Sequence, residues 1–466
     1  MNLLIGLVIL LCLLCSELQA AQAANDLWTR VIFVALVTLT VPGLALFQTL
    51  VVSKRIRNGE IESQEREGLL RRLSVCHSAV WLSASLAIIW AVRWQDVVRG
   101  NWSLDNWPVL DEAIILAPIV FSLVASWAIF YEIQHAIAGA NPDRSAEPKK
   151  SNVKQSRSAF VSIRFRVYFL MVLVPVAIVV LVKDLAPWVD TLSPEFRWAL
   201  YGAAGLAMLG GFPFLLLLML KTSRIKSADL KSELLETCRL HRLRVHDIRV
   251  WKTDNQIVNA LVAGVVPRLR VILMSDALLN CFPRNELLAI LRHEAGHLRL
   301  WHLPTRIGFG VLPLLALAID ERNAHGAIAS VESMLVGAGL PAGAGLALLM
   351  LLYAAYAFFG LSWLSHQMEY EADIYACQQK TASGSTNVST EQTSDMSDAL
   401  LRLAAINPEQ FEKSSLLHPS IGRRIKMIRT VATDPEQGTL FSKSFARRRR
   451  IVFLILFAIC LIALLS

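Results

Sequence analysis

Long apolar runs dominate the pattern of hydrophobic and polar positions along the chain. A helix that crosses a membrane needs about 20 mostly apolar residues. Runs of this kind occupy residues 28–52, 77–95, 112–133, 167–183, 198–220 and 340–364, and shorter runs occupy residues 307–319 and 451–466. The pattern therefore predicts a mainly α-helical, polytopic membrane protein with about eight or nine hydrophobic segments, the N-terminal one included.

The N-terminal segment fits two interpretations. Residues 1–15 form an apolar run, and the following stretch "LQAAQAAND" places small residues at Ala21 and Ala23, as signal-peptide cleavage sites do. No Lys or Arg precedes the run, whereas signal peptides usually have a positively charged region before their apolar segment. Residues 1–23 are therefore either a signal peptide or a first hydrophobic segment, and either alternative leaves the start of the 28–52 helix outside.

Composition supports a membrane protein. The apolar share is 55% and only 18% of the residues are charged, which is too hydrophobic for an ordinary soluble domain. The 7 cysteines are scattered, several of them inside apolar runs. We therefore expect reduced packing residues rather than a disulfide framework.

The formal charge of +9 is unevenly placed along the chain. Lys and Arg gather in the loop after residue 52 and in the loop at 134–166, whereas stretches 93–111 and 183–197 hold few. The positive-inside rule then puts the basic loops in the cytoplasm. The basic excess is a topology signal, so we expect a multi-pass protein of the cell (inner) membrane, with the lipid bilayer and no nucleic acid among its partners.

The alternation of apolar and polar regions predicts the domain organisation. The predicted parts are a signal peptide or first segment (1–23), a transmembrane bundle (24–220), a cytoplasmic polar region (221–304), a hydrophobic hairpin (305–364), a second polar region (365–447) and a C-terminal hydrophobic helix (448–466). Within the second polar region, the low-complexity stretch "KTASGSTNVSTEQTSDMSD" is predicted to be a flexible loop.

The first polar region contains a candidate metal site in "LLAILRHEAGHLRLWH". Residues 284–300 have the apolar spacing of a helix, on which His293 and His297 lie one turn apart on the same face. Both imidazoles can then reach one zinc ion, with Glu294 beside a bound water. Zinc lowers the pKa of such a water to about 7, and a carboxylate can take its proton as the water attacks a peptide carbonyl.

A catalytic zinc usually has a third protein ligand. His302 follows His297 by five residues without a glycine turn, so we interpret it as a histidine at a helix end or membrane interface. A better candidate is Glu369 in "SHQMEYEADIYA", because Asp373 lies one turn further on the same helical face and can support a ligand histidine. Glu371 is expected to point elsewhere.

The predicted third ligand constrains the topology. If only the long apolar run ending near residue 364 crossed the membrane, Glu369 and His293 would lie on opposite sides. Both this run and the run at 307–319 must cross, or neither does. We favour a hairpin of two spanning or partly submerged helices, although the 13 residues of the shorter run cover only about 20 Å of a hydrocarbon core of roughly 30 Å.

Two further stretches fit a zinc peptidase. "DNQIVNALVAG" and "RLRVILMSDALL" are strand-like, and an exposed edge strand at Asn259 and Ala260 could bind an extended peptide through its main chain. In "LHPSIGRRIKMI", His418 precedes a helix. It could donate a hydrogen bond to the oxyanion that forms at the carbonyl, or it could be structural.

Four ordered motifs, "NALVAG", "ELLAILRHEAGH", "EYEAD" and "HPSIGRRI", resemble the integral-membrane gluzincin metalloproteases, a family that includes HtpX and the CAAX prenyl endopeptidases. The resemblance covers roughly residues 225–430 and implies a cytoplasmic zincin-type α+β catalytic domain with a small sheet. It implies that His293, His297 and Glu369 bind zinc, that Glu294 is the general base, and that Asp373 supports a ligand histidine. It also implies that His418 lies near the substrate and that Asn259 belongs to the edge-strand motif.

The resemblance is incomplete in the N-terminal half, where more hydrophobic segments precede the peptidase part than HtpX has. The leading hypothesis is a membrane endopeptidase with one Zn²⁺ per chain, which cuts membrane-associated proteins or peptides at the cytoplasmic face in protein quality control. The alternatives are a prenyl-protein endopeptidase, a sensor-transducer that cleaves a cytoplasmic repressor, and a catalytically silent scaffold. The short outer loops disfavour the sensor, and the filled catalytic positions disfavour the scaffold.

Overall fold

The structure is a computed structural model of the 466-residue chain. It describes residues 22–61, 63–107, 109–139, 156–264, 266–319, 321–339, 344–380 and 386–465, together with isolated positions between residues 5 and 16. Most of residues 1–23, and residues 140–155 of the basic loop at 134–166, therefore lie outside the described residues. The choice between a signal peptide and a first hydrophobic segment stays a prediction.

The chain divides into two compact units, of which the first comprises Met1–Met208 and Leu215–Lys221. Its helices follow the apolar runs of the sequence, as predicted. They are α2 (Leu27–Arg57), α3 (Ser63–Leu86), α4 (Leu110–Gly139), α5 (Arg157–Arg164), α6 (Met171–Val189) and most of α7 (Pro194–Met219), with short π or 3-10 turns η1 (Ala87–Ala91), η2 (Asp96–Asn101), η3 (Leu104–Asn106) and η4 (Phe165–Leu170).

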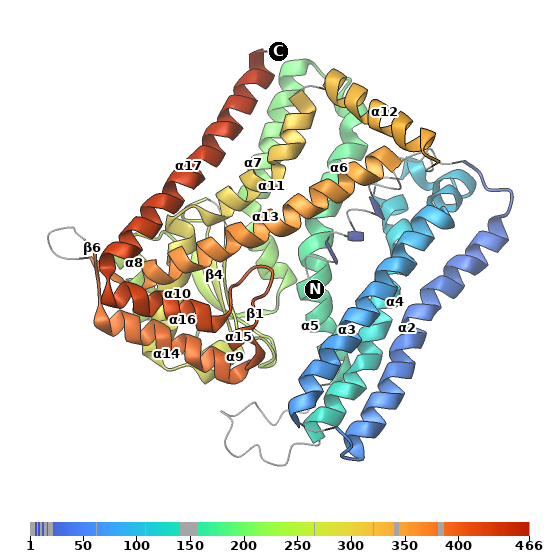
Figure 1. Ribbon diagram of the computed structural model, residues 1–466. Coiled ribbons are helices and arrows are strands. Elements are labelled where there is room, and N and C mark those ends of the chain that lie inside the picture. The colour runs from blue at the N-terminus through green and yellow to red at the C-terminus, as the bar shows by residue number, and fades with distance from the viewer. Residues whose placement is uncertain are drawn as a thin grey trace. The chain divides into compact units, whose positions relative to one another are not determined.

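Within this unit α2, α3 and α4 lie side by side (Figure 1). In the part of the chain that the structure describes, four helices are long and apolar enough to cross a membrane: Leu27–Arg57, Gly68–Ala91, Leu110–Ile133 and Arg157–Val189. A fifth is added if the two halves of α7, which meet at 47°, form one span. These helices make the chain a multi-pass membrane protein by length and composition.

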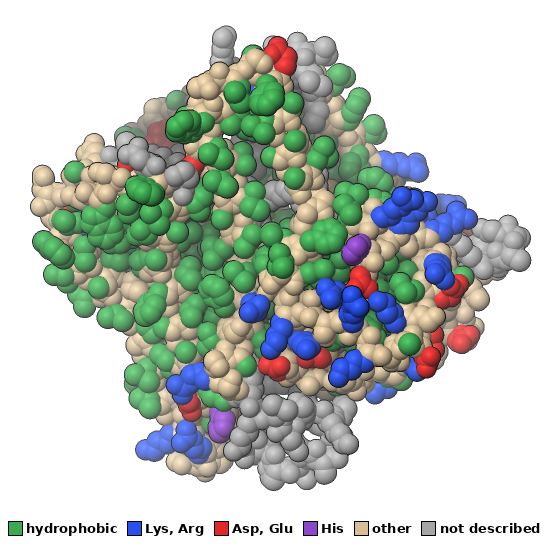
Figure 2. Space-filling view, turned by 180° about the vertical axis from the view of Figure 1, so that it is seen from behind, with side chains coloured by type: hydrophobic (Ala, Val, Ile, Leu, Met, Phe, Trp, Pro, Cys, Tyr) green, Lys and Arg blue, Asp and Glu red, His purple; other side chains and the backbone are tan. Residues whose placement is uncertain are grey.

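The surface agrees with that conclusion. Hydrophobic side chains cover large areas of one face of the molecule (Figure 2). On α2, the outward-facing side chains of Ile32, Phe33, Leu36 and Phe47 are all more than half exposed. Apolar side chains can stay exposed on a helix that faces lipid, whereas a soluble protein would bury most of them.

The second unit comprises Leu209–Phe214 and Thr222–Ser466. It contains a four-stranded sheet, a two-stranded hairpin and most of the remaining helices. The strands are β1 (Thr222–Arg224), β2 (Asp247–Trp251), β3 (Ala260–Ala263), β4 (Val271–Ser275), β5 (Gln378–Lys380) and β6 (Thr386–Val388). The helices are α8 (Ala228–Leu240), α9 (Asp276–Cys281), α10 (Arg284–Arg299), α11 (His302–Ile319), α12 (Glu321–Gly337), α13 (Ala344–Ala376), α14 (Thr390–Ile406), α15 (Glu409–Glu412), α16 (Ile421–Thr433) and α17 (Pro435–Leu465).

The larger sheet has the strand order β1-β2-β4-β3. β2 and β4 are parallel, and β1 and β3 are antiparallel to their neighbours. β4 is buried along its whole length, as its unbroken apolar sequence requires, whereas β3 is an edge strand of the sheet. The two strands predicted before the metal helix correspond to β3 and β4, while β1 and β2 were not predicted.

The predicted hairpin at 305–364 is built from three helices rather than two. α11 covers the short apolar run, α12 is an additional helix, and α13 covers the long run and continues without a break to Ala376. Glu369 and Asp373 therefore lie on the same helix as the apolar run and not on a separate segment after it. Within the described residues, none of these three helices combines the length and the apolar composition of a membrane span.

The prediction of a flexible loop at residues 380–398 is wrong for the residues that the structure describes. The segment forms strand β6 and then the first half of α14, while residues 381–385 lie outside the described residues. Ser389 caps α14 by accepting a hydrogen bond from the backbone N–H of Gln392. Met396 and Leu400 are buried one turn apart, so the Ser/Thr-rich composition belongs to the polar face of an amphipathic helix.

Candidate metal centre

Helix α10 places the two histidines of the "HEAGH" motif. It begins after Pro283, as predicted, and its buried face, which includes Leu287 and Leu291, packs into the core of the second unit. His293 and His297 lie one turn apart and face α13. Gly296 allows the two helices to approach closely, because a Cβ atom there would lie only 3.1 Å from the Cα of Ala372 on α13.

The structure brings His293, His297 and Glu369 together. Potential ligand atoms of the three side chains all lie within 4.8 Å of one another. Nε2 of His293 is 3.6 Å from Oε2 of Glu369, and Nε2 of His297 is 3.4 Å from Oε1 of the same carboxylate. The side chain of Glu369 is 3% exposed, and those of the two histidines are also largely covered.

This donor set fits a zinc ion. Two imidazole nitrogens and one carboxylate oxygen are a ligand combination of catalytic zinc sites, which leave a further coordination position for water or substrate. The two Nε2 atoms lie 3.1 Å apart. A divalent cation is the group that can satisfy two imidazole lone pairs and a buried carboxylate at one point.

The far side of His293 is held by a buried ion pair. Its Nδ1 lies 2.9 Å from Oδ1 of Asp373, which is completely buried. Arg424 on α16 donates two hydrogen bonds to Asp373, of 2.8 and 2.7 Å, and its third nitrogen is 3.3 Å from Glu369. Asp373 therefore occupies the position expected of a residue that orients a ligand histidine. Arg424 belongs to a recognised motif, but no role was predicted for it.

The far side of His297 is also covered, by His302 and Glu371, for which no role at the site was predicted. His302 lies at a helix end, the start of α11, which is one of the two predicted alternatives; it is 1% exposed, and its Nδ1 lies 2.8 Å from Nδ1 of His297. Its Nε2 lies 2.9 Å from Oε2 of Glu371. As predicted, Glu371 does not share the direction of Glu369. Its carboxylate contacts His302 at the start of α11, and His302 in turn contacts His297.

Burial and neighbouring charges shift the pKa values of Glu294, His293 and Glu369. Burial raises the pKa of Glu294 to about 7, and the Glu369 carboxylate adds to that rise. Burial opposes the charged form of His293, but the Asp373 and Glu369 carboxylates outweigh it and raise its pKa to about 9. Burial also opposes ionisation of Glu369, yet its contacts with His293, His418 and Arg424 hold its pKa well below its usual range. Glu369 is thus an anion, as a metal ligand has to be.

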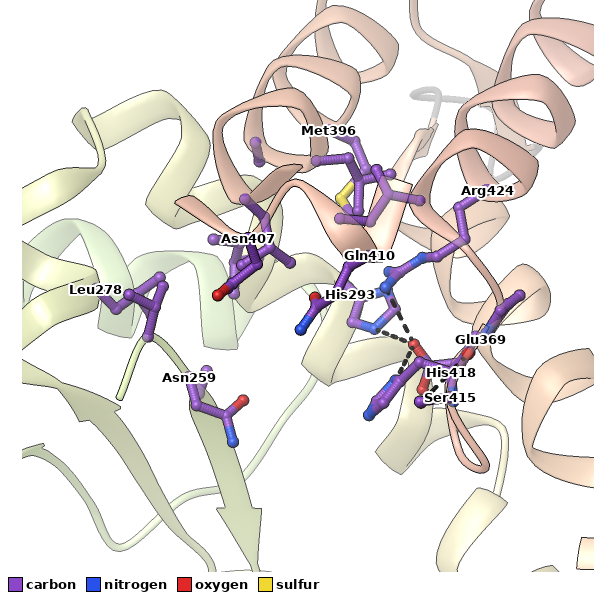
Figure 3. Close-up of a pocket in the computed structure, with 18 of the residues that line it drawn as sticks. Asn259, Leu278, His293, Glu369, Met396, Asn407, Gln410, Ser415, His418 and Arg424 are labelled. Atoms are coloured by element: carbon purple, nitrogen blue, oxygen red, sulfur yellow. Dashed lines mark hydrogen bonds and ion pairs between the residues drawn. The ribbon is translucent and has the colours of Figure 1, made fainter. Parts of the chain in front are cut away.

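A cavity of about 260 Å³ opens at these residues. In Figure 3, His293, Glu369 and Arg424 lie on one side of it, and Asn259 and Leu278 lie on the other. Its wall is mostly apolar, formed by Val258, Leu278, Phe282, Ile290, Met396, Ala399, Leu400, Leu403 and Ile421, with Asn407, Gln410, Lys413 and Ser415 on the polar side. The apolar residues of α14 in this wall come from the segment that was predicted to be a loop.

Three of the remaining predicted residues line the same cavity. Asn259 and Ala260 stand at the start of edge strand β3, and Ser275 of β4 bonds the backbone of Asn259. His418 lies in the loop before α16 with its side chain 59% exposed, and its Nδ1 is 3.1 Å from Oε2 of Glu369. Every residue proposed from the sequence therefore lies at or directly behind this cavity.

The fold and site define the class: a multi-pass membrane protein whose second unit has a buried His/His/Glu cluster on two packed helices, beside an edge strand. Residues 224–432 match the model of peptidase family M48, and this part of the chain is a metalloprotease domain of that family. The match confirms the family resemblance of the four motifs.

A solved structure, described as the crystal structure of S. mikatae Ste24p, is similar with a TM-score of 0.40 and 16% sequence identity, over 88% of this chain and 100% of that chain. No curated protein matched the chain.

Proposed function

We propose that this M48 metallopeptidase is a zinc-dependent endopeptidase that binds one Zn²⁺ through His293, His297 and Glu369 and cleaves membrane-associated proteins at the cytoplasmic face. The observation that carries the proposal is the meeting of these three ligand atoms within 4.8 Å in a cavity that Glu294 also lines. A zinc ion held there would lower the pKa of a water molecule and polarise the scissile carbonyl.

Glu294 is the proposed general base. It lines the cavity beside the cluster, and burial raises the pKa of its carboxyl to about 7. A group with such a pKa can take a proton from the attacking water and return it to the leaving amine near neutral pH. A cation bound beside Glu294 favours its ionised form, which is the form that acts as a base.

His418 and β3 are proposed to bind the substrate. The side chain of His418 is 59% exposed, so a bound peptide can displace its contact with Glu369, and its imidazole can then donate to the developing oxyanion. Since β3 is an edge strand, its outer side at Asn259 and Ala260 can pair with an extended peptide. The apolar wall of the cavity favours a large apolar side chain next to the cut.

The cytoplasmic orientation is supported by the distribution of basic residues among the loops of the first unit. A protease with its site on that side, attached to a multi-pass membrane unit, meets membrane proteins as substrates. HtpX-like quality control is therefore the proposed role, in the cell (inner) membrane. Labelling of engineered cysteines with a membrane-impermeant reagent tests the orientation, since labelling of the region 221–304 from outside the cell contradicts it.

The direct test compares wild type with Glu294→Gln in purified, detergent-solubilised full-length protein. Both should bind one zinc per chain, and cleavage of a casein-type or membrane-protein substrate should fall by about 10²–10⁴-fold in the variant, because the general base is gone. Glu391→Gln, which changes an exposed glutamate on α14, is the matched control and should cleave as wild type does. Equal cleavage by Glu294→Gln and wild type would remove the assignment of the base.

The prenyl-protein alternative differs in substrate and not in chemistry. Matched peptides with and without a C-terminal prenylcysteine motif distinguish the two. A quality-control protease cleaves both unprenylated peptides and unfolded membrane proteins, whereas a prenyl endopeptidase requires the lipid group.

A further inference from the structure

A series of hydrogen-bonded side chains, His302, Glu371 and Arg449, lies behind His297, on the side away from the proposed metal site. His302, at the start of α11, lies 2.8 Å from His297, and Glu371 of α13 lies 2.9 Å from His302. Arg449 of α17 donates a hydrogen bond of 2.8 Å to the same Glu371 oxygen. His302 and Glu371 are 1% and 2% exposed, so water does not compete for these contacts.

The donor and acceptor of each hydrogen bond in this series can be assigned by starting from Arg449. A guanidinium has only donors, so the Glu371 oxygen that faces Arg449 is an acceptor. His302 therefore donates to it from Nε2, which leaves Nδ1 of a neutral His302 as an acceptor. His297 must then donate from its own Nδ1.

That assignment fixes the tautomer of His297. With the proton on Nδ1, the Nε2 atom carries a lone pair, and this is the atom that lies 3.4 Å from Glu369 and 3.1 Å from Nε2 of His293. A neutral imidazole binds a metal only through its unprotonated nitrogen. The chain thus selects the tautomer of His297 that can bind zinc and holds the ring in place.

The arrangement parallels the one behind His293. There a buried carboxylate, Asp373, contacts the histidine directly and is paired with an arginine of α16. Behind His297 the carboxylate acts through an intervening imidazole and is paired with an arginine of α17. Each histidine therefore has a buried carboxylate–arginine pair on its far side, and packing alone does not require such pairs, because apolar residues of similar volume are often as stable in a core.

We propose that His302, Glu371 and Arg449 are positioning residues that hold His297 in its metal-binding tautomer, and that the C-terminal helix α17 thereby contributes to the metal site. The inference rests on the proposed zinc function. None of the three residues touches the ligand cluster except through His297.

The experiment measures zinc affinity by competition with a chromogenic chelator in detergent-solubilised full-length protein. His302→Phe keeps a flat ring but removes both ring nitrogens, and Arg449→Met removes the guanidinium. We expect about 10–100-fold weaker zinc binding for His302→Phe and a smaller loss for Arg449→Met. Arg450→Met, which changes the exposed neighbour of Arg449, should bind zinc as wild type does.

Two readouts separate positioning from a merely structural role. The melting temperature of the metal-free protein shows whether a variant has lost its fold, and the visible spectrum of the Co²⁺-substituted protein reports the ligand geometry. The proposal expects a changed Co²⁺ spectrum with a metal-free melting temperature close to that of the control. Arg449→Lys keeps a donor to Glu371 and should recover most of the affinity lost in Arg449→Met.

The outcomes also separate this inference from the proposed function. If wild type binds zinc tightly and His302→Phe and Arg449→Met bind it as Arg450→Met does, with an unchanged Co²⁺ spectrum, the positioning role is overturned. A loss of affinity that only accompanies unfolding of the metal-free protein overturns it as well. If wild type itself binds no zinc, the proposed function fails first.

Discussion

Replacement of Arg424 by methionine tests how the site is held together. The Arg424 side chain is buried, and it donates two hydrogen bonds to Asp373, of 2.8 and 2.7 Å, while a third nitrogen lies 3.3 Å from Glu369. Methionine fills much of the same space but provides no donor. Asp373 is completely buried, so in the variant its charge keeps only His293 as an ionic partner among the contacts described.

The size of the effect follows from the burial of the pair. Removal of one partner of a buried ion pair costs about 3–5 kcal/mol, because the other charge stays in a poorly solvated place. We take the lower value, about 3 kcal/mol, since His293 still contacts Asp373. For a unit of this size, about 1 kcal/mol lowers the melting temperature by roughly 2–4 °C, so the expected loss is roughly 6–12 °C.

The assay is thermal unfolding of the metal-free full-length protein in detergent, followed by tryptophan fluorescence at one scan rate. Arg423→Met is the matched control: it removes the adjacent arginine of the same helix, which is exposed, and should change the melting temperature by no more than a surface substitution does. Equal melting temperatures for Arg423→Met and Arg424→Met would refute the view that the Asp373 pair holds α16 against α13.

Three further predictions concern helix contact, metal and thiols. Gly296→Val forces α10 away from α13, with an overpacking cost of about 1–3 kcal/mol, and should lose zinc faster on dialysis against a chelator; unchanged retention would contradict the close contact. Zinc at about 100 times its Kd should stabilise wild type by about 2.7 kcal/mol in thermal unfolding and leave His297→Ala unaffected; equal shifts would exclude His297 as a ligand. Burial raises the pKa of Cys238 to about 11 and that of Cys377 to about 12, so both stay protonated thiols at pH 8. When the folded protein is treated with a maleimide, mass spectrometry should find both cysteines unmodified, while the partly exposed Cys281 is labelled. Rapid modification of Cys377 would contradict its burial.

The apolar pattern predicted the helices of the first unit well because lipid-facing helices need uniformly apolar stretches of a certain length. It predicted their ends less well, since α2 continues past the apolar run to Arg57 and α3 begins at Ser63. These additional turns are polar, and polar residues at helix ends carry no hydropathy signal.

Local pattern was misleading where a helix is half polar. The segment that begins α14 was predicted as a loop from its Ser, Thr and Asp content, although Met396, Leu400 and Leu403 recur at helical spacing. Its apolar face packs beside α10 and lines the cavity, so the error concealed part of the substrate wall. A test for period as well as composition would have found it.

The sequence alone determined the local chemistry of the site: two histidines at helical spacing with a glutamate between them, and two acidic residues one turn apart further on. Spacing along a helix decides which side chains share a face, and this needs no knowledge of the rest of the chain. Only the tertiary structure decided that α13 lies against α10, that Arg424 pairs with Asp373, and that His302 and Glu371 stand behind His297. These contacts join residues from about 50 to more than 75 positions apart, and they arise from how whole helices pack, which no local pattern encodes.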